Sequence, residues 1–170
     1  ITGRAKDLII RGGHNIDPAE IEDALLAHPA VAFAGAIGQP DAHAGELPCA
    51  FVELVEGAEV TEEALMAHAK VHIHERAAYP KHLTILPELP KTAVGKVFKP
   101  ALRMQAIERV YNAALEAAEL PARVVSVIDD RRRGLVAQVE RNGADEDAVC
   151  HCLGAFTRPW EWAASENAGG

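Results

Sequence analysis

The chain has 170 residues, of which 49% are hydrophobic and 25% charged, and its formal net charge is -8 at pH 7. This composition is typical of a globular domain, and the acidic balance argues against a nucleic-acid module, which usually carries a strongly basic face. No apolar run approaches the roughly 20 residues of a membrane span, so we expect no span and a cytoplasmic location. Because the chain begins at Ile1 rather than at a methionine, we expect it to be part of a longer polypeptide.

An amino-terminal β-hairpin followed by a helix is expected at the start of the chain. Residues 8–10 are apolar, and Gly12 and Gly13 allow the backbone angles of a tight turn. Asp17 is a favourable N-cap, and Pro18 suits the first position of a helix. The pattern therefore predicts a strand, a glycine turn, a second short strand and a capped helix.

The middle of the chain predicts two paired strands, a second helix and a return strand. The runs AVAFAGAIG (30–38) and LPCAFVELV (47–55) have strand character, and the turn-rich segment between them favours antiparallel pairing. Thr61 is the expected N-cap of the second helix, and KHLTILPEL (81–89) is expected to return as a strand.

After a loop around Gly95, an Ala-rich helix is expected from about Pro100 to Leu120. Two strands joined by the basic turn 131–133 and a further helix should follow. The predicted fold class is α+β, with a small mixed or antiparallel sheet, helices on one face, an amino-terminal β-hairpin and a ββα carboxy-terminal appendage. The expected divisions of the chain are residues 1–110, 111–156 and 157–170.

The loop LPKTAVGKVFKPALR (89–103) places Lys96 directly after Gly95. It is not a Walker A loop, because that motif requires a glycine where Pro90 stands and a Ser or Thr where Val97 stands. The glycine turn can still project an ammonium that stabilises charge on a phosphate or carboxylate oxygen. The alternative is an exposed lysine in a surface turn. The side chains expected to anchor the flanks of the loop are Leu89, Val94, Val97 and Phe98.

Two long motifs give the chain a family resemblance. The pattern G-R-x-[KD]-D-x-I-x-x-x-G-x-x-I-x-P-x-E-I-E is met from Gly3 to Glu22, and P-K-T-x-x-G-K-[IV]-x-[RK]-x-x-L-R from Pro90 to Arg103. Together they resemble the signatures of the carboxy-terminal domain of AMP-forming acyl-CoA synthetases, in the adenylate-forming superfamily. The resemblance covers about residues 1–110, and Lys99 stands where the family more often has Arg.

The resemblance implies that the chain is a mobile lid. In such enzymes an amino-terminal domain of the same polypeptide binds ATP, with Mg, and a carboxylic acid, and joins them as an acyl-adenylate. The lid then rotates, and the thiol of coenzyme A displaces AMP. The chain alone is therefore expected to be inactive and to hold neither ATP nor coenzyme A. Its expected partners are that domain, coenzyme A and the acid in the form of its acyl-adenylate.

The resemblance also implies roles for single residues. Lys96 matches the lysine that enters the active site for adenylation, with Gly95 supporting its turn. Lys6 matches the hinge about which the lid turns, and Asp7 is assigned to the same hinge. Arg4 and Asp7 match positions of the motif that are expected to tether the hinge strand, with Arg4 as a supporting residue.

Gly12, Gly13 and His14 match the turn that lines the pantetheine channel after rotation. Two alternatives share these motifs: a lid that serves the phosphopantetheine arm of a carrier protein, and a binding module without turnover. No metal site is expected, since neither the histidines at 68, 72 and 74 nor the motif around His151, with its closely spaced cysteines, completes a ligand set.

Overall fold

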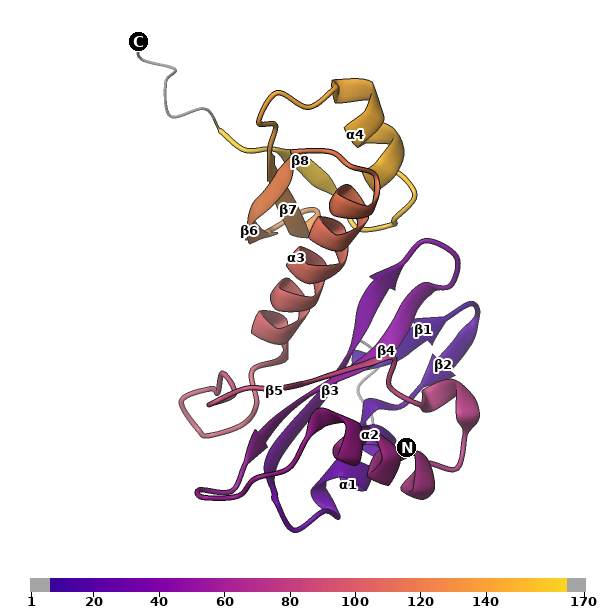
Figure 1. Ribbon diagram of the computed structural model, residues 1–170, viewed down its shortest axis with the longest axis vertical. Helices are drawn as coiled ribbons and strands as arrows, with labels where there is room; N and C mark the ends of the chain where they lie inside the picture. Colours follow the sequence, from indigo (N-terminus) through magenta and orange to yellow (C-terminus); the bar gives the residue numbers. More distant parts are fainter. Residues whose placement is uncertain (1–6, 165–170) are drawn as a thin grey trace. The chain divides into compact units, whose positions relative to one another are not determined.

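The computed structural model describes residues 7–164, which divide into two compact units. Unit 1 ends at Arg103 and unit 2 begins at Met104, so the boundary falls within one helix, α3 (Lys99–Ala117) (Figure 1). The predicted hinge residue Lys6 and the supporting residue Arg4 lie outside the described residues. Within residues 7–164, no helix combines the length and the hydropathy needed to cross a membrane.

Unit 1 is a five-stranded sheet with two helices packed together on one face (Figure 1). β4 is the central strand: it pairs antiparallel with β3 along its whole length, antiparallel with β1 at its beginning, and parallel with β5. The elements, in chain order, are β1 (Ile9–Arg11), β2 (His14–Ile16), α1 (Pro18–Leu26), β3 (Val31–Asp41), β4 (Gly45–Leu54), α2 (Glu62–His72), the 3-10 turn η2 (Arg76–Ala78) and β5 (His82–Ile85). The predicted hairpin and the predicted antiparallel pair are confirmed.

The caps that the sequence predicts set the beginnings of α1 and α2. Asp17 accepts a hydrogen bond from the backbone N–H of Ala19 at 2.9 Å, and Pro18 takes the first helical position. Thr61 Oγ1 accepts from the N–H of Ala64 at 3.1 Å. These bonds satisfy N–H groups that a helix leaves free in its first turn, so each helix begins where the predicted cap stands.

The other face of the sheet in unit 1 is covered close to the lysine loop. Gly35 on β3 lies opposite Phe51 on β4. A Cβ at Gly35 would come within 2.7 Å of Leu102 Cδ1 and 3.0 Å of Val97 Cγ1, closer than packed carbon atoms tolerate. Glycine at this position therefore lets the end of the loop and the first turns of α3 lie directly on the sheet.

Unit 2 combines the rest of α3 with a three-stranded sheet and a further helix. Its elements are β6 (Arg123–Asp130), β7 (Gly134–Glu140), α4 (Glu146–Leu153) and β8 (Trp160–Trp162). The predicted ββα order is confirmed, and β8 extends it, because it pairs parallel with β7. Trp160 and Trp162 are partly buried on the core of this unit, with ring centroids 4.9 Å apart.

The predicted basic turn of unit 2 is held by an acidic residue. The carboxylate of Asp130 accepts from the backbone N–H groups of Arg133 at 3.0 Å and Arg132 at 2.8 Å, and it also pairs with the Arg133 guanidinium. These bonds, led by the Arg133 N–H, lower the pKa of Asp130 to about 2. The exposed arginines therefore form a hairpin tip.

Three histidines meet at the contact between α1 and α2. The Nε2 of His68 lies 3.0 Å from the carbonyl oxygen of Ala24, its ring stacks on His72 with centroids 4.1 Å apart, and His28 lies edge-on at 4.9 Å. Burial, reinforced by the neighbouring His72, lowers the pKa of His68. Among the described residues, no group of three His, Cys, Asp or Glu side chains could hold a metal ion.

Acidification should therefore destabilise unit 1. In the unfolded chain, His68 is protonated near its ordinary pKa of about 6.5, whereas the folded chain takes up this proton only at lower pH. Protonation therefore favours the unfolded chain, and the free energy of unfolding decreases as the pH falls below about 6.5. We expect the denaturant midpoint of unit 1 to fall between pH 7 and pH 5, and His68→Gln to flatten that dependence. The matched control is His74→Gln, at an exposed position, and an equal flattening there would contradict the assignment.

Candidate functional site

The lysine loop, residues 89–99, closes into a short turn around Gly95. The N–H of Gly95 donates to the carbonyl of Thr92 at 2.9 Å, and the N–H of Thr92 donates to the carbonyl of Lys96 at 2.7 Å. The Lys96 N–H donates to Thr92 Oγ1 at 3.2 Å, and Lys91 pairs with Val97 as an isolated antiparallel bridge. Gly95 has φ 83°, a left-handed conformation that glycine adopts without strain. The tip that carries Lys96 is thus a closed, hydrogen-bonded turn.

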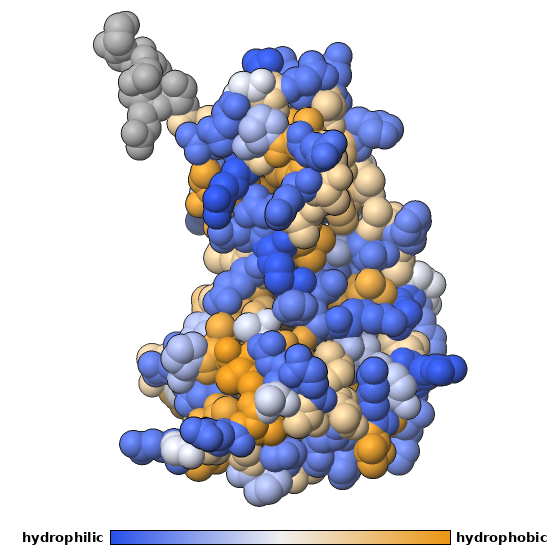
Figure 2. All heavy atoms as spheres, in the orientation of Figure 1, coloured by the Kyte–Doolittle hydropathy of each residue, from blue (hydrophilic) through white to orange (hydrophobic). Residues whose placement is uncertain are grey.

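The Lys96 side chain is exposed, and its ammonium forms no hydrogen bond or ion pair with any described residue. Leu89 is buried as predicted, but the prediction that Val94 anchors a flank is wrong, because this side chain is 81% exposed. Val94 lies in the middle of the turn, where no neighbouring strand covers it. Figure 2 shows hydrophobic residues gathered on the side of unit 1 where Figure 1 places this loop. Val94 and Phe98 in the loop are exposed, and so is Phe33, whose ring lies beside the Lys91 ammonium.

Two acidic side chains hold the ends of the lysine loop. Glu53 on β4 binds the ammonium of Lys91 at 2.6 Å and also accepts from the Leu89 N–H at 2.9 Å. The bond to Lys91, followed by the bond to Leu89, lowers the pKa of Glu53. Beyond the turn, Glu22 on α1 binds the Lys99 ammonium at 3.0 Å, so Lys forms a pair here where the family more often has Arg.

The predicted hinge neighbour Asp7 is tied to the beginning of α3. Its carboxylate accepts from Arg103 Nη2 at 3.1 Å, and both side chains are largely enclosed. This ion pair joins the first described residue of unit 1 to the last. Asp7 is therefore held in place by a side chain from the other end of the unit's sequence.

The predicted channel residues lie at the turn between β1 and β2. Gly12 and Gly13 have φ of 52° and 80°, and no described atom lies within 4 Å of a Cβ built on either. The N–H of Gly12 donates to the carbonyl of Ala44 at 2.7 Å, which fixes the turn to the beginning of β4. The His14 imidazole contacts the carboxylate of Glu75. The turn is thus firmly held and open on its outer side.

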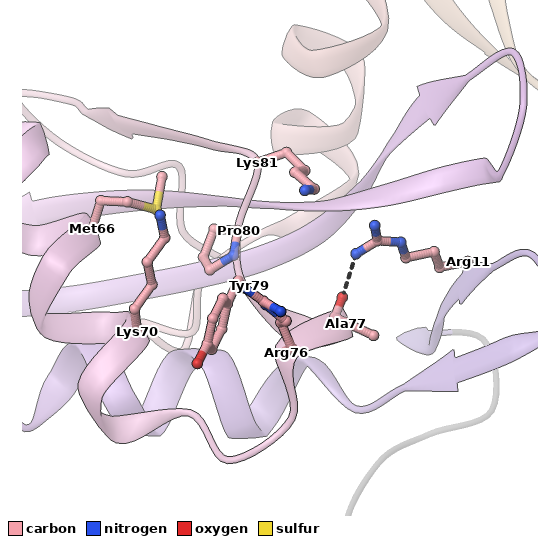
Figure 3. Close-up of a pocket in the computed structure, with 8 residues that line it drawn as sticks. All are labelled: Arg11, Met66, Lys70, Arg76, Ala77, Tyr79, Pro80 and Lys81. Carbon is pink, nitrogen blue, oxygen red and sulfur yellow. Dashed lines mark hydrogen bonds between the residues drawn. The ribbon is translucent and has the colours of Figure 1, made fainter.

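Beside this hairpin lies a basin of about 760 Å³ that no motif of the sequence predicts (Figure 3). Arg11 reaches it from β1, and its Nη1 donates to the carbonyl of Ala77 at 2.8 Å. Four of the lining side chains are cationic: Arg11, Lys70, Arg76 and Lys81. Met66, Tyr79 and Pro80 supply apolar surface. Such a basin suits an anionic ligand with an aromatic part.

The two predicted sites lie at opposite ends of β4. Arg11, next to the glycine turn, pairs with Gly45 at the beginning of this strand, whereas Glu53 holds the lysine loop near its end. Glu53 lies eight positions after Gly45 along the strand, which is roughly 26 Å at about 3.3 Å per residue. The structure therefore does not bring Lys96 and the glycine turn together.

Comparisons with known proteins match this chain to one family model and to curated CoA ligases. Residues 20–96 match the AMP-binding enzyme C-terminal domain. The marinolic acid–CoA ligase of Pseudoalteromonas sp. (strain SANK 73390) is 44% identical over 140 residues, covering 82% of this chain and 21% of that protein. The peroxisomal trans-cinnamate:CoA ligase of Petunia hybrida is 41% identical over 128 residues, covering 73% of this chain and 22% of that protein. The alignment with the first relative is too long for unit 1 alone, so it extends into unit 2.

Solved structures match about the length of unit 1. Apo MatB from Rhodopseudomonas palustris has a TM-score of 0.55 at 37% identity, covering 59% of this chain and 20% of that chain. The amide bond synthetase McbA from Marinactinospora thermotolerans has a TM-score of 0.54 at 32% identity, covering 60% and 21%. The chain spans about one fifth of the length of the curated relatives it matches.

Proposed function

This chain belongs to the AMP-binding enzyme C-terminal domain family, and on that premise we propose that it is the lid of an AMP-forming acyl-CoA ligase. In the proposed reaction a carboxylate oxygen attacks the α-phosphate of ATP and pyrophosphate leaves. The thiol of coenzyme A then attacks the acyl carbon, and AMP leaves as the thioester forms. The observation that carries the proposal is the exposed ammonium of Lys96, which has no partner within residues 7–164, on a turn held at both ends.

In the adenylation step, Lys96 acts as a fixed cation. Its ammonium orients the carboxylate of the acid and stabilises the negative charge that grows around the α-phosphate. ATP, Mg and the acid are held by an amino-terminal domain of the same polypeptide, against which the exposed apolar side chains beside Lys96 pack. Lys6 and Asp7 form the hinge of this motion, and the Asp7–Arg103 pair anchors it to unit 1.

In the thioester step, the glycine hairpin faces the acyl-adenylate instead. The open outer side of Gly12 and Gly13, with His14 beside them, lets the thin pantetheine arm pass close to the backbone. The cationic basin binds the phosphates at the other end of coenzyme A, and Tyr79 offers a ring for its adenine. Both features adjoin β1, so a single extended molecule can contact both.

We expect the double variant Arg76→Ala, Lys81→Ala of the full-length enzyme to raise KM for coenzyme A about tenfold or more. Each lost charge-assisted hydrogen bond weakens phosphate binding by roughly 1.5–3 kcal/mol. Acid-dependent ATP–pyrophosphate exchange should be unchanged, since it precedes coenzyme binding. Initial rates at varied coenzyme A measure the first quantity, and isotope exchange the second.

The same assay separates the alternatives. A carrier protein presents pantetheine without the 3′-phosphoadenosine end, so use of a carrier with no response to coenzyme A would assign the lid to carrier loading. If the unaltered enzyme showed no acid-dependent exchange, the remaining alternative would be a binding module without turnover. The control is Arg131→Ala at the exposed tip of unit 2, and an equal rise in KM there would contradict the assignment of the basin.

A further inference from the structure

We infer that Glu53 is a positioning residue for adenylation, acting through Lys91 to hold the turn that presents Lys96. This inference rests on the proposed role of Lys96 as the adenylation cation. Glu53 lies outside both sequence motifs, on the central strand of unit 1, and it does not lie on the tip that carries Lys96. Its effect on the reaction would therefore be transmitted through the base of the loop.

The contacts of Glu53 converge on the first residues of the loop. One oxygen, Oε1, accepts both from the Leu89 N–H at 2.9 Å and from the Lys91 ammonium at 2.6 Å. The same ammonium donates to the carbonyl of Leu89 at 3.3 Å and lies 4.3 Å from the centroid of the Phe33 ring. Phe33 is the residue opposite Glu53 in the β3–β4 ladder. Two strands of the sheet thus hold one lysine.

The enclosure of this ion pair favours a fixed loop. The Lys91 and Glu53 side chains are only 19% and 17% exposed, so water screens their attraction less than it screens that of a surface pair. The lowered pKa of Glu53 agrees with a carboxylate held in its charged form. Leu89, whose backbone N–H donates to the same carboxylate, is 1% exposed, so the base of the loop is buried in the unit.

The base of the loop controls its tip because the turn is short. Lys91 forms the antiparallel bridge to Val97, and Thr92, the next residue, makes the hydrogen bonds that close the turn around Lys96. A shift of Lys91 therefore moves the residue that carries the cation. Displacing a catalytic group by about 1 Å can cost on the order of a hundredfold in rate.

The charges of the loop also show which lysine remains free. Lys91 is neutralised by Glu53 and Lys99 by Glu22, whereas the ammonium of Lys96 has no partner among the described residues. Loss of Glu53 would release a second ammonium close to the first. Glu53 thus fixes the position of the turn and, as far as the described part of the chain shows, leaves Lys96 as its free cation.

The test uses the full-length enzyme with Glu53→Gln and, separately, Lys91→Met. Each variant should slow acid-dependent ATP–pyrophosphate exchange about tenfold to a hundredfold in kcat. Conversion of supplied acyl-adenylate and coenzyme A to thioester should stay within about twofold of the unaltered enzyme. Lys91→Arg should restore exchange, because a guanidinium can bind the same carboxylate. The double variant should be no slower than the slower single variant, since both changes break one contact.

The matched control is Glu62→Gln on α2. Its carboxylate accepts from the Ile85 N–H at 2.8 Å, so it makes the same kind of bond to backbone outside the lysine loop, and both rates should be retained. Unchanged exchange in Glu53→Gln, or equal loss of both half-reactions in both variants, would overturn the inference. Lys96→Ala in the same assays distinguishes failure of the proposed function from failure of the inference about Glu53. If Lys96→Ala leaves exchange intact, the proposed function is wrong. If Lys96→Ala abolishes exchange while the Glu53 and Lys91 variants retain it, only the inference about Glu53 is wrong.

Discussion

Replacing Lys96 with alanine in the full-length enzyme is expected to reduce acid-dependent ATP–pyrophosphate exchange by at least about a hundredfold. The exposed ammonium is the charge that we assign to the carboxylate and the α-phosphate, and loss of such a preorganised group costs roughly 2.7–4 kcal/mol of transition-state stabilisation. Supplied acyl-adenylate should still react with coenzyme A at nearly the original rate, because the opposite end of β4 serves that step. Isotope exchange and thioester formation measure the two half-reactions separately.

Two further variants test this division of labour. Lys96→Arg keeps the charge but changes its reach and geometry, so it should retain part of the exchange activity. Val71→Ala alters a comparably exposed valine on α2, outside the lysine loop and the basin lining, and should affect neither step. Equal loss of both half-reactions in Lys96→Ala would mean that the lysine serves the fold or both steps.

Replacing Gly13 with leucine should have the opposite effect, with exchange retained and thioester formation reduced by at least about tenfold. The space around this position is open in unit 1, so the added side chain meets no described atom and instead occupies the path proposed for pantetheine. The left-handed backbone, with φ 80°, adds strain of roughly 1–2 kcal/mol for a residue with a Cβ. Single-turnover reaction of supplied acyl-adenylate with coenzyme A measures the defect.

Backbone strain can be separated from obstruction because the chain contains a matched glycine. Gly57 follows β4, has φ 81° and also has open space around a built Cβ. Gly57→Leu carries the same strain in a segment with no assigned role, so it should leave thioester formation unchanged. A collapse of exchange in Gly13→Leu, or an equal defect in Gly57→Leu, would contradict the channel assignment.

The sequence predicts those parts of unit 1 that local chemistry determines. Asp17 and Thr61 cap their helices as expected, because each supplies an oxygen that accepts from an N–H left free in the first turn. Gly95 adopts the expected turn, because the left-handed backbone favours glycine. These features depend on neighbours within a few residues, which a single sequence displays.

Features that depend on distant segments were not predicted. The basin forms only where β1, α2 and the segment from η2 to β5 meet, so the sequence alone does not place Arg11 near Lys81. The signals of the basin that the sequence offers are two cations: Arg11, directly before the glycine turn, and Lys81, directly after Pro80. β8 was missed because three residues show no alternation long enough to identify a strand. The exposure of Val94 depends on tertiary covering that its hydrophobicity does not reveal.

The length of β4 between the two assigned surfaces has a consequence for the order of events. No side-chain movement carries an ammonium over such a distance, so if both surfaces serve one reaction centre as proposed, unit 1 has to reorient as a body between the two steps. In the proposed scheme, the path for the thiol lies away from the reaction centre while Lys96 occupies it, and Lys96 lies away from the centre once unit 1 has rotated. On this proposal, the distance between the two surfaces itself keeps the thiol from attacking before adenylation is complete.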